Sequence, residues 1–256
     1  MSKETSPLLF CHIPKTAGSS LKTLVGQASK SVVWVYNGEL ALGNPNLDFA
    51  KSFRAAERPG IVMGHFSFGG HRLLGIPPRY ATILRNPLDR VVSLYRHQTA
   101  LTASGGPVSP EIASAIRNGM TLSDFITSEV TEMTNNHMCR IIAGIPPEAG
   151  MKLTESWLLD LALHNLRRHF LLAGTVAAID DAVAALGRLL GWQDPRLGVE
   201  NTSDGAAPEL GTDTLATLSE FNALDLQLYR EVADHPERYG VRPPNRVREA
   251  GPSTSE

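Results

Sequence analysis

Residues 8–20 have the sequence LLFCHIPKTAGSS, which predicts a strand, a loop and the start of a helix. The apolar run at 8–13 predicts a buried strand, and residues 19–25 continue with helical spacing. The lysine, small residues and hydroxyl groups between them suit a loop that binds an anion, because a helix start offers backbone amides and the positive end of its dipole. A plain turn whose serine caps the helix has the same composition. Lys15 precedes Gly18, so the Walker pattern GxxxxGK[ST] is absent and an ordinary ATPase is disfavoured.

Similar apolar runs occur further along the chain, at residues 31–35, 61–64, 80–84 and 170–173. Helical spacing of apolar residues is found at 88–97, 122–128, 136–143, 153–166, 179–190 and 215–232. Strands alternating with helices predict an α/β fold of three layers, with a central parallel sheet flanked by helices. Ligands of such sheets bind at the carboxyl ends of the strands. The segment TASGGPVSP, residues 102–110, predicts a surface loop of the kind from which acceptor pockets are built.

A second anion-binding element is predicted at residues 80–95, YATILRNPLDRVVSLY. Arg85 ends the predicted strand, and Pro87 suits the first position of a helix. Ser93 lies two helical turns beyond Asn86, so its hydroxyl and the guanidinium of Arg85 are expected to hold one phosphate. Arg90 is more simply interpreted as the partner of the sheet edge or of an acidic neighbour.

A candidate general base follows the third predicted strand. Histidine is the usual base near neutral pH, and His65 in GHFSFG emerges at a strand's carboxyl end. A structural histidine, hydrogen-bonded at a strand end, is the alternative interpretation. His71 is an alternative base and His12 a third candidate, although His12 is expected to pack or to orient the loop. The other histidines show no catalytic companions; His97 is expected at a helix C-terminus, and the rest are His137, His164, His169 and His235.

Taken together, HIPKTAGSS and the R-N-P-x-x-R-x-x-S run resemble the sulfotransferase family typified by heparan sulfate 2-O-sulfotransferase. The resemblance implies an α/β, three-layer P-loop-like fold and the donor PAPS (3'-phosphoadenosine 5'-phosphosulfate), with PAP as product. It implies that Lys15 contacts the sulfuryl-bearing phosphate and stabilises the leaving group. The rest of the loop would wrap the phosphosulfate, through Thr16, Ala17, Gly18, Ser19 and Ser20. Arg85 and Ser93 would bind the 3'-phosphate, and His65 would be the base.

Later segments resemble the family more loosely. Residues 135–144 are similar to its N-x-x-x-R-x-x-x-G helix, and 171–181 to its late strand and helix. Residues 200–203 are similar to a loop that closes near the cofactor in relatives, so the segment 196–203 around Arg196 and Ser203 is a further candidate for nucleotide binding. We expect one sulfotransferase domain over residues 1–242 and a disordered tail over 243–256.

Composition and charge limit the partners, metal sites and location that the chain is expected to have. The chain has 256 residues, a net charge of −2 and no apolar run near the length of a membrane helix. A nucleic-acid partner is therefore not expected, nor is a membrane span. Cys11 and Cys139 lie in apolar patterns, which fits neither a disulfide framework nor a metal site, and the expected chemistry needs no metal. Residues 1–7 lack the features of a secretory signal, so a cytoplasmic location is expected.

The acceptor and the competing functions are less closely defined. Without the membrane anchor typical of eukaryotic relatives, and with abundant Ala, Leu, Gly and Arg, the chain is more similar to a bacterial member of the family. Its acceptor is expected to be a carbohydrate or another small hydroxylated molecule. One rival is a kinase or other nucleotide phosphotransferase, which predicts a Walker lysine and a magnesium-binding acid that the sequence does not show. The other is a non-catalytic module that binds PAPS or a polysaccharide.

Overall fold

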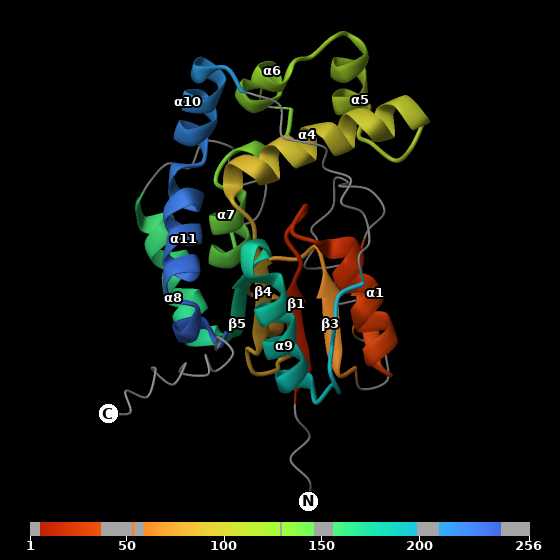
Figure 1. Cartoon of the computed structure of the whole chain (residues 1–256), viewed down its shortest axis with the longest axis vertical. Helices are drawn as coiled ribbons and strands as arrows, with labels where there is room; N and C mark the ends of the chain where they lie inside the picture. The colour runs from red at the N-terminus through yellow and green to blue at the C-terminus, as the bar shows by residue number, and fades with distance from the viewer. Residues whose placement is uncertain are drawn as a thin grey trace, which may run out of the picture.

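A five-stranded sheet lies at the centre of the fold, in the order β2-β3-β1-β4-β5, and every neighbouring pair is parallel (Figure 1). The computed structural model describes residues 6–36, 53, 59–128, 130–145, 156–198 and 210–241. The strands are β1 (Leu8–Cys11), β2 (Val32–Val35), β3 (Ile61–Gly64), β4 (Tyr80–Leu84) and β5 (Phe170–Thr175). The α-helices are α1 (Gly18–Ala28), α3 (Gly70–Leu74), α4 (Pro87–Ser104), α5 (Pro110–Arg117), α6 (Leu122–Thr127), α7 (His137–Ala143), α8 (Ser156–His169), α9 (Ile179–Leu190), α10 (Thr212–Phe221) and α11 (Ala223–Asp234). The short 3-10 turns are η1 (Glu132–Thr134), η3 (Val176–Ala178) and η4 (Pro236–Tyr239).

The two faces of the sheet pack against different helices because successive side chains of a strand point to opposite sides. In β1, Leu8 and Phe10 join a core with α1 and α9. Leu9 and Cys11 join the other core, with α7, α8 and α11. Both faces are therefore covered, which explains why the strands are continuous apolar runs rather than alternating ones. The expected α/β, three-layer fold is confirmed.

A group of helices lies beyond the carboxyl ends of the strands. In Figure 1, α4, α5, α6 and α10 stand above the edge of the sheet where β1 and β4 end. Their apolar faces form two small cores of their own, one around Val91 and Ile126 and the other around Leu94 and Phe125. The edge at which ligands bind in parallel sheets therefore faces a helical roof.

The strand register aligns three loops at this edge. Cys11 is level with Gly64, and Gly64 is level with Val35. The ladder continues one residue further, because the His12 amide donates to the Gly64 carbonyl at 2.9 Å and the His65 amide donates to the Val35 carbonyl at 2.9 Å. The residues that follow β1, β2 and β3 therefore stand in one row.

All five predicted strands are confirmed, but several helices differ from the prediction. The helix expected at 88–97 extends to Ser104, so it includes the first residues of the predicted loop 102–110. The single helix expected at 215–232 is wrong, since the chain is interrupted at Asn222 between α10 and α11. The sequence did not predict α3 or α5. The tail at 243–256 lies outside the described residues, so its disorder and the single domain over 1–242 stay predictions.

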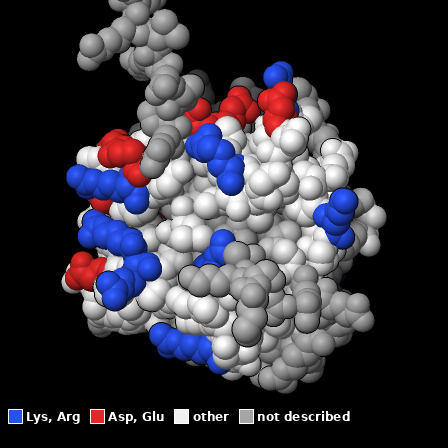
Figure 2. Space-filling view, turned by 90° about the horizontal axis from the view of Figure 1, so that it is seen from below, with Lys and Arg blue, Asp and Glu red and all other residues white. Residues whose placement is uncertain are grey.

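The opposite face of the molecule carries charges of both signs. Figure 2 views it from below, and there Lys and Arg side chains are interspersed with Asp and Glu. No single-sign patch covers the part of this face that the structure describes. Within the described residues, no helix combines the length and apolar character that crossing a membrane requires.

Candidate active site

The loop between β1 and α1 is held in a strained conformation. Lys15 and Ala17 have φ angles of 71° and 63°. Each left-handed residue with a side chain costs about 1–2 kcal/mol, and such strain concentrates at functional sites. Thr16 is fully buried and its Oγ1 donates to the Ile13 carbonyl at 2.8 Å. Thr16 therefore fixes the loop from inside and can offer an anion only its backbone amide.

The start of α1 fits the predicted anion-binding role. Ala17 occupies the N-cap position, no side chain caps the helix, and the first turn contains no acid. Amides at a helix start have no partner within the helix, and the dipole makes this end positive. Ser19 is exposed and Ser20 is partly buried at this end. The loop and the helix start together form a site suited to a phosphate or sulfate group.

Three rings stand side by side directly after β1, β2 and β3. The His65 ring packs against both His12 and Tyr36, with centroid distances of 4.9 Å to each. The His12 and Tyr36 rings are 5.5 Å apart at 66°. Among the described residues, neither nitrogen of His12 nor the hydroxyl of Tyr36 has a hydrogen-bond partner, although all three atoms are buried. The sequence analysis did not identify Tyr36, although its place directly after a predicted strand was the available signal.

Two glycines make this close arrangement possible. A Cβ on Gly18 would lie 2.0 Å from Cε1 of His12, so only glycine lets the ring fit against the start of α1. A Cβ on Gly64 would lie 2.1 Å from the carbonyl oxygen of Val35. His12 therefore packs against the anion loop, in the position expected of a residue that orients it.

Burial keeps the two imidazoles neutral. Loss of solvation lowers the pKa of His65 to about 4. Burial, followed by the proximity of His65 and Lys15, lowers the pKa of His12 to about 3. At pH 7 both rings are uncharged, and His65 has the protonation state that a general base requires.

The second predicted element reaches the first through Arg85. Arg85 follows β4, and its Nη1 donates to the carbonyl oxygen of Lys15 at 3.3 Å. Asn86 caps α4 by accepting hydrogen bonds from the amides of Leu88 and Asp89, at 2.9 and 3.4 Å. Pro87 occupies the first turn, as expected. The guanidinium and the loop lysine therefore lie at one edge of the sheet.

Ser93 is buried on the same helix, with 5% of its surface exposed. The binding of one phosphate by both Ser93 and Arg85 stays a prediction. Helical geometry places residues 86, 90 and 93 on one side of α4. Ser93 thus lies on the side of the helix that carries the buried Arg90.

Arg90 is an interior residue rather than a surface partner. It is 0% exposed and donates through Nη2 to the Met133 carbonyl at 2.5 Å. Burial lowers the pKa of Arg90 to about 10, while the Asp225 carboxylate opposes this shift. The expected influence of an acidic neighbour is thus present. Within the described part of the chain, however, the direct partner of Arg90 is a carbonyl, and its Nε and Nη1 have none.

Asn136 and Asp225 join α7 and α11 by capping each other's helices. Asn136 Oδ1 accepts from the amides of Leu224 and Asp225 at 2.9 and 3.1 Å. The Asp225 carboxylate accepts from the amides of Met138 and Cys139 at 2.9 and 2.8 Å. The segment compared with the family's N-x-x-x-R-x-x-x-G helix therefore has a structural role here, which sequence analysis did not predict.

His71 lies in a different environment from His65. Its Nδ1 is 2.9 Å from the hydroxyl of Tyr80, the first residue of β4. Its ring also contacts Phe68 at a centroid distance of 5.3 Å. Tyr80 belongs to the core with α7, α8 and α11, on the face of the sheet opposite to α1. The structure therefore does not bring this alternative base to the anion loop.

His97 and His137 both depart from the sequence expectation. His97 is not at a helix C-terminus, because α4 continues to Ser104; burial and the proximity of Lys15 lower its pKa. His137 is not isolated, since burial and the nearby Arg90, Arg140 and His65 lower its pKa well below the usual value. The remaining histidines are placed elsewhere: His164 and His169 contact each other, and His235 lies 4.0 Å from Glu231.

The remaining sequence predictions have mixed outcomes. The late strand and helix are present as β5 and α9. Arg196 forms an exposed ion pair with Asp194 at 3.0 Å. The loop at 200–203 lies outside the described residues. Among the residues described, no group of His, Cys, Asp and Glu has an arrangement suited to a metal ion.

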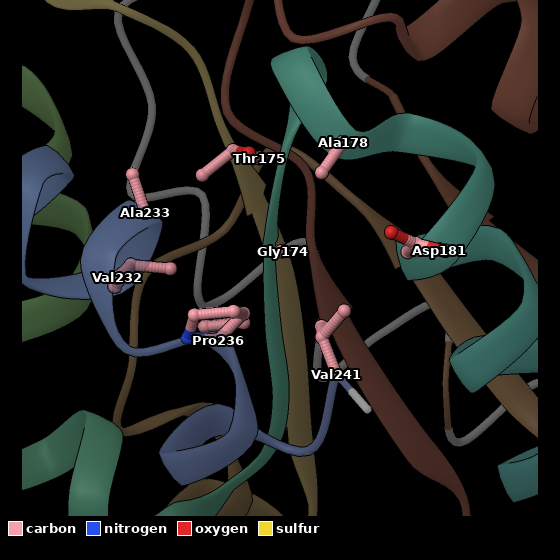
Figure 3. A pocket seen from close by; sticks show the side chains of 9 residues that line it. Gly174, Thr175, Ala178, Asp181, Val232, Ala233, Pro236 and Val241 are labelled. Carbon is pink, nitrogen blue, oxygen red and sulfur yellow. The ribbon is translucent and has the colours of Figure 1, made fainter. Parts of the chain in front are cut away.

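A small cavity lies between β5, α9 and α11 (Figure 3). It encloses about 60 Å³ and is lined mainly by apolar side chains such as Val232, Pro236 and Val241. Ligand pockets for drug-sized molecules are usually about 300–1,000 Å³. This cavity is therefore too small for a nucleotide, and the candidate site remains the edge that carries Lys15 and His65.

The chemistry available at this edge is that of anion binding next to a neutral base. Lys15, the amides of α1 and Arg85 supply positive charge and donors, and His65 supplies a lone pair. Group transfer from an anionic donor to a hydroxyl needs these functions together.

Comparison with known proteins identifies the family. The family model described as "Sulfotransferase family" matches residues 1–145, which is more than half of the 256-residue chain. No curated protein matches the sequence. The matched region includes the anion loop, His65 and the β4–α4 element. The chain therefore belongs to the sulfotransferase family, whose members transfer a sulfuryl group from a sulfonate donor to an acceptor.

Proposed function

We propose that this sulfotransferase-family chain transfers a sulfuryl group from PAPS to a hydroxyl group of a carbohydrate or another small hydroxylated acceptor. The observation that carries the proposal is the hydrogen bond of 3.3 Å from Arg85 to the Lys15 carbonyl. It joins the two predicted anion-binding elements at one edge of the sheet. A nucleotide with phosphates at both its 5' and 3' positions fits such a paired arrangement.

On the donor side, Lys15 and the amides at the start of α1 would bind the 5'-phosphosulfate. The bond between sulfur and the bridging oxygen breaks, and its electron pair stays on the phosphate of PAP. Positive charge near this oxygen stabilises the leaving group as the charge develops. Gly18 allows the backbone to approach, while Ser19 and Ser20 lie at the helix start.

On the acceptor side, His65 would accept the proton of the attacking hydroxyl. The new bond forms between the acceptor oxygen and sulfur, in line with the bond that breaks. Because the pKa of His65 is lowered to about 4, its lone pair is available at neutral pH. Arg85 and Ser93 would bind the 3'-phosphate and so fix the donor relative to this base.

Membership of the sulfotransferase family weighs against the kinase alternative. The non-catalytic module is distinguished by turnover rather than by binding, since it would hold PAP without transferring a group. A cytoplasmic location and a bacterial type of acceptor complete the proposal.

The direct test is transfer from PAPS to a panel of oligosaccharides and small hydroxylated compounds, followed by mass spectrometry. We expect one class of acceptor to gain a sulfuryl group. His65→Gln should lower turnover by about 100-fold or more, the scale of general-base removal, and leave PAP affinity nearly unchanged. His71→Gln is the matched control and should retain most of the activity.

Each other outcome rejects a specific part of the proposal. PAP binding without transfer to any acceptor would favour the non-catalytic module. Loss of activity in His71→Gln but not in His65→Gln would move the base to His71. Loss of PAP binding in His65→Gln would remove His65 from the role of base.

A further inference from the structure

The ring of His65 packs against two rings, His12 and Tyr36, that α1 in turn contacts. Lys22 Nζ lies 5.0 Å from the centre of the Tyr36 ring, and Gly18 lies against the His12 ring. Residues 18 and 22 are one turn apart, so they share a face of the helix. One face of α1 therefore contacts both rings, Tyr36 and His12, against which the His65 ring packs.

Contacts between rings orient the imidazole of His65. Within the described residues, the ring packs against the rings of His12 and Tyr36. Its backbone amide is fixed by the Val35 carbonyl, and its ring meets Tyr36 edge-on at 81° and His12 at 33°. Many catalytic histidines are instead oriented by a carboxylate. Among the residues described here, ring packing takes the place of such a carboxylate.

Among the described residues, the groups found next to His65 include no acid. They are His12 after β1, Tyr36 from the end of β2, and His137 at the start of α7. Burial raises the pKa of the Tyr36 phenol beyond its usual range, so the phenol stays neutral. None of these described groups carries a negative charge that would stabilise an imidazolium, and the two adjacent rings limit access of water to His65.

We propose that Tyr36 and His12 are positioning residues, whose rings pack together against the imidazole of His65, fix its direction and shield it from water. This inference rests on the proposed function, in which His65 is the base. It assigns the contribution of Tyr36 to its ring, because the Tyr36 hydroxyl is buried without a partner among the described residues. Loss of either ring would let water reach His65 and would let its imidazole rotate.

The test is to titrate the histidines of the full-length protein by NMR, with the His65 signal identified by its absence in His65→Gln. Tyr36→Leu should raise the His65 pKa from about 4 toward the ordinary value near 6.5, by at least about one unit. Tyr36→Phe, which restores the ring, should leave the His65 pKa where it is in the native protein. Tyr95→Leu is the matched control, since Tyr95 packs on Phe125 in the helical roof.

A second variant removes the other ring that packs against His65. His12→Leu should also raise the His65 pKa, and the acid limb of the kcat/KM profile should move with it in both variants. Circular dichroism confirms folding before each titration. An unchanged His65 pKa in folded Tyr36→Leu and His12→Leu overturns the inference, as does a shift in Tyr36→Phe equal to that in Tyr36→Leu.

The titration and the activity assay separate this inference from the proposed function. A His65 pKa that shifts as expected, in a protein whose activity does not depend on His65, supports the ring arrangement and rejects the base. Activity that depends on His65, with a pKa insensitive to both rings, supports the base and rejects the positioning role.

Discussion

The two anion-binding elements of the candidate site are built in different ways. The loop at residues 13–20 is stabilised by near neighbours in sequence, as when Thr16 donates to Ile13 three residues away. The β4–α4 element depends on distant partners, since Arg85 reaches Lys15 across 70 residues and Arg90 reaches Met133 across 43. The first is a local structure, whereas the second exists only when the whole fold is formed.

The two elements are therefore expected to contribute differently to the reaction. In the loop, strain at Lys15 and Ala17 is stored where the anion would bind, and the helix start is left uncapped. In α4, the cap is supplied by Asn86, and the buried Arg90 is directed into the protein. We therefore expect substitutions in the loop to affect the chemical step most, and substitutions around α4 to affect nucleotide affinity and stability.

The largest effect should come from Lys15→Met. Removing a charge that stabilises a transition state typically lowers kcat by about 100- to 1,000-fold. The effect should fall on kcat more than on PAP affinity, because the charge on the bridging oxygen develops during transfer. Steady-state kinetics with PAPS and the best acceptor provides the measurement.

Lys30→Met is the matched control, since Lys30 is an exposed lysine outside the loop. It changes net charge by the same amount and should leave kcat within about twofold, as expected of an exposed charge screened by salt. Equal losses in the two variants would mean that overall charge, rather than the loop geometry, is responsible.

A smaller effect should appear in the dependence of stability on pH. His12 and His65 have lowered pKa values in the folded protein, about 3 and about 4. The unfolded chain therefore binds more protons than the folded chain between about pH 6.5 and 4, and the free energy of unfolding should fall as the pH falls through that window. Each such histidine contributes up to about 1.4 kcal/mol per pH unit.

Urea denaturation at pH 7, 6 and 5 measures this slope for the native protein and for two variants. His12→Gln should flatten it, because one buried imidazole is lost. His97→Gln should change it less, because the side chain of His97 on α4 is only partly desolvated, whereas His12 is buried. The same flattening in both variants would contradict the distinction between the two regions.

Much of the loop could be predicted from sequence because its determinants are contiguous. An apolar strand, small residues, a lysine and a helix follow one another, and all five strands of the sheet were predicted from such apolar runs. The helix boundaries were harder. Gly105 ends α4 well after the last clear apolar repeat, and Asn222 breaks the final helix by donating to the carbonyls of Thr134 and Leu218.

The ring of Tyr36 and the caps exchanged by Asn136 and Asp225 could not be predicted in the same way. Tyr36 meets His65 only because β2 and β3 are paired in a particular register. Asn136 and Asp225 are 89 residues apart in sequence, and nothing near either one indicates the other. These contacts depend on strand order and helix packing, which local patterns do not specify.

Calorimetric titration with PAP and with AMP, which lacks the 3'-phosphate, tests whether the two anion-binding elements act on one nucleotide. Paired sites for 5'- and 3'-phosphates predict that PAP binds at least about 10-fold more tightly than AMP, the contribution of a charged hydrogen bond. Arg85→Ala should abolish most of that preference and leave AMP binding nearly unchanged. Equal affinities for PAP and AMP in the native protein would contradict the account.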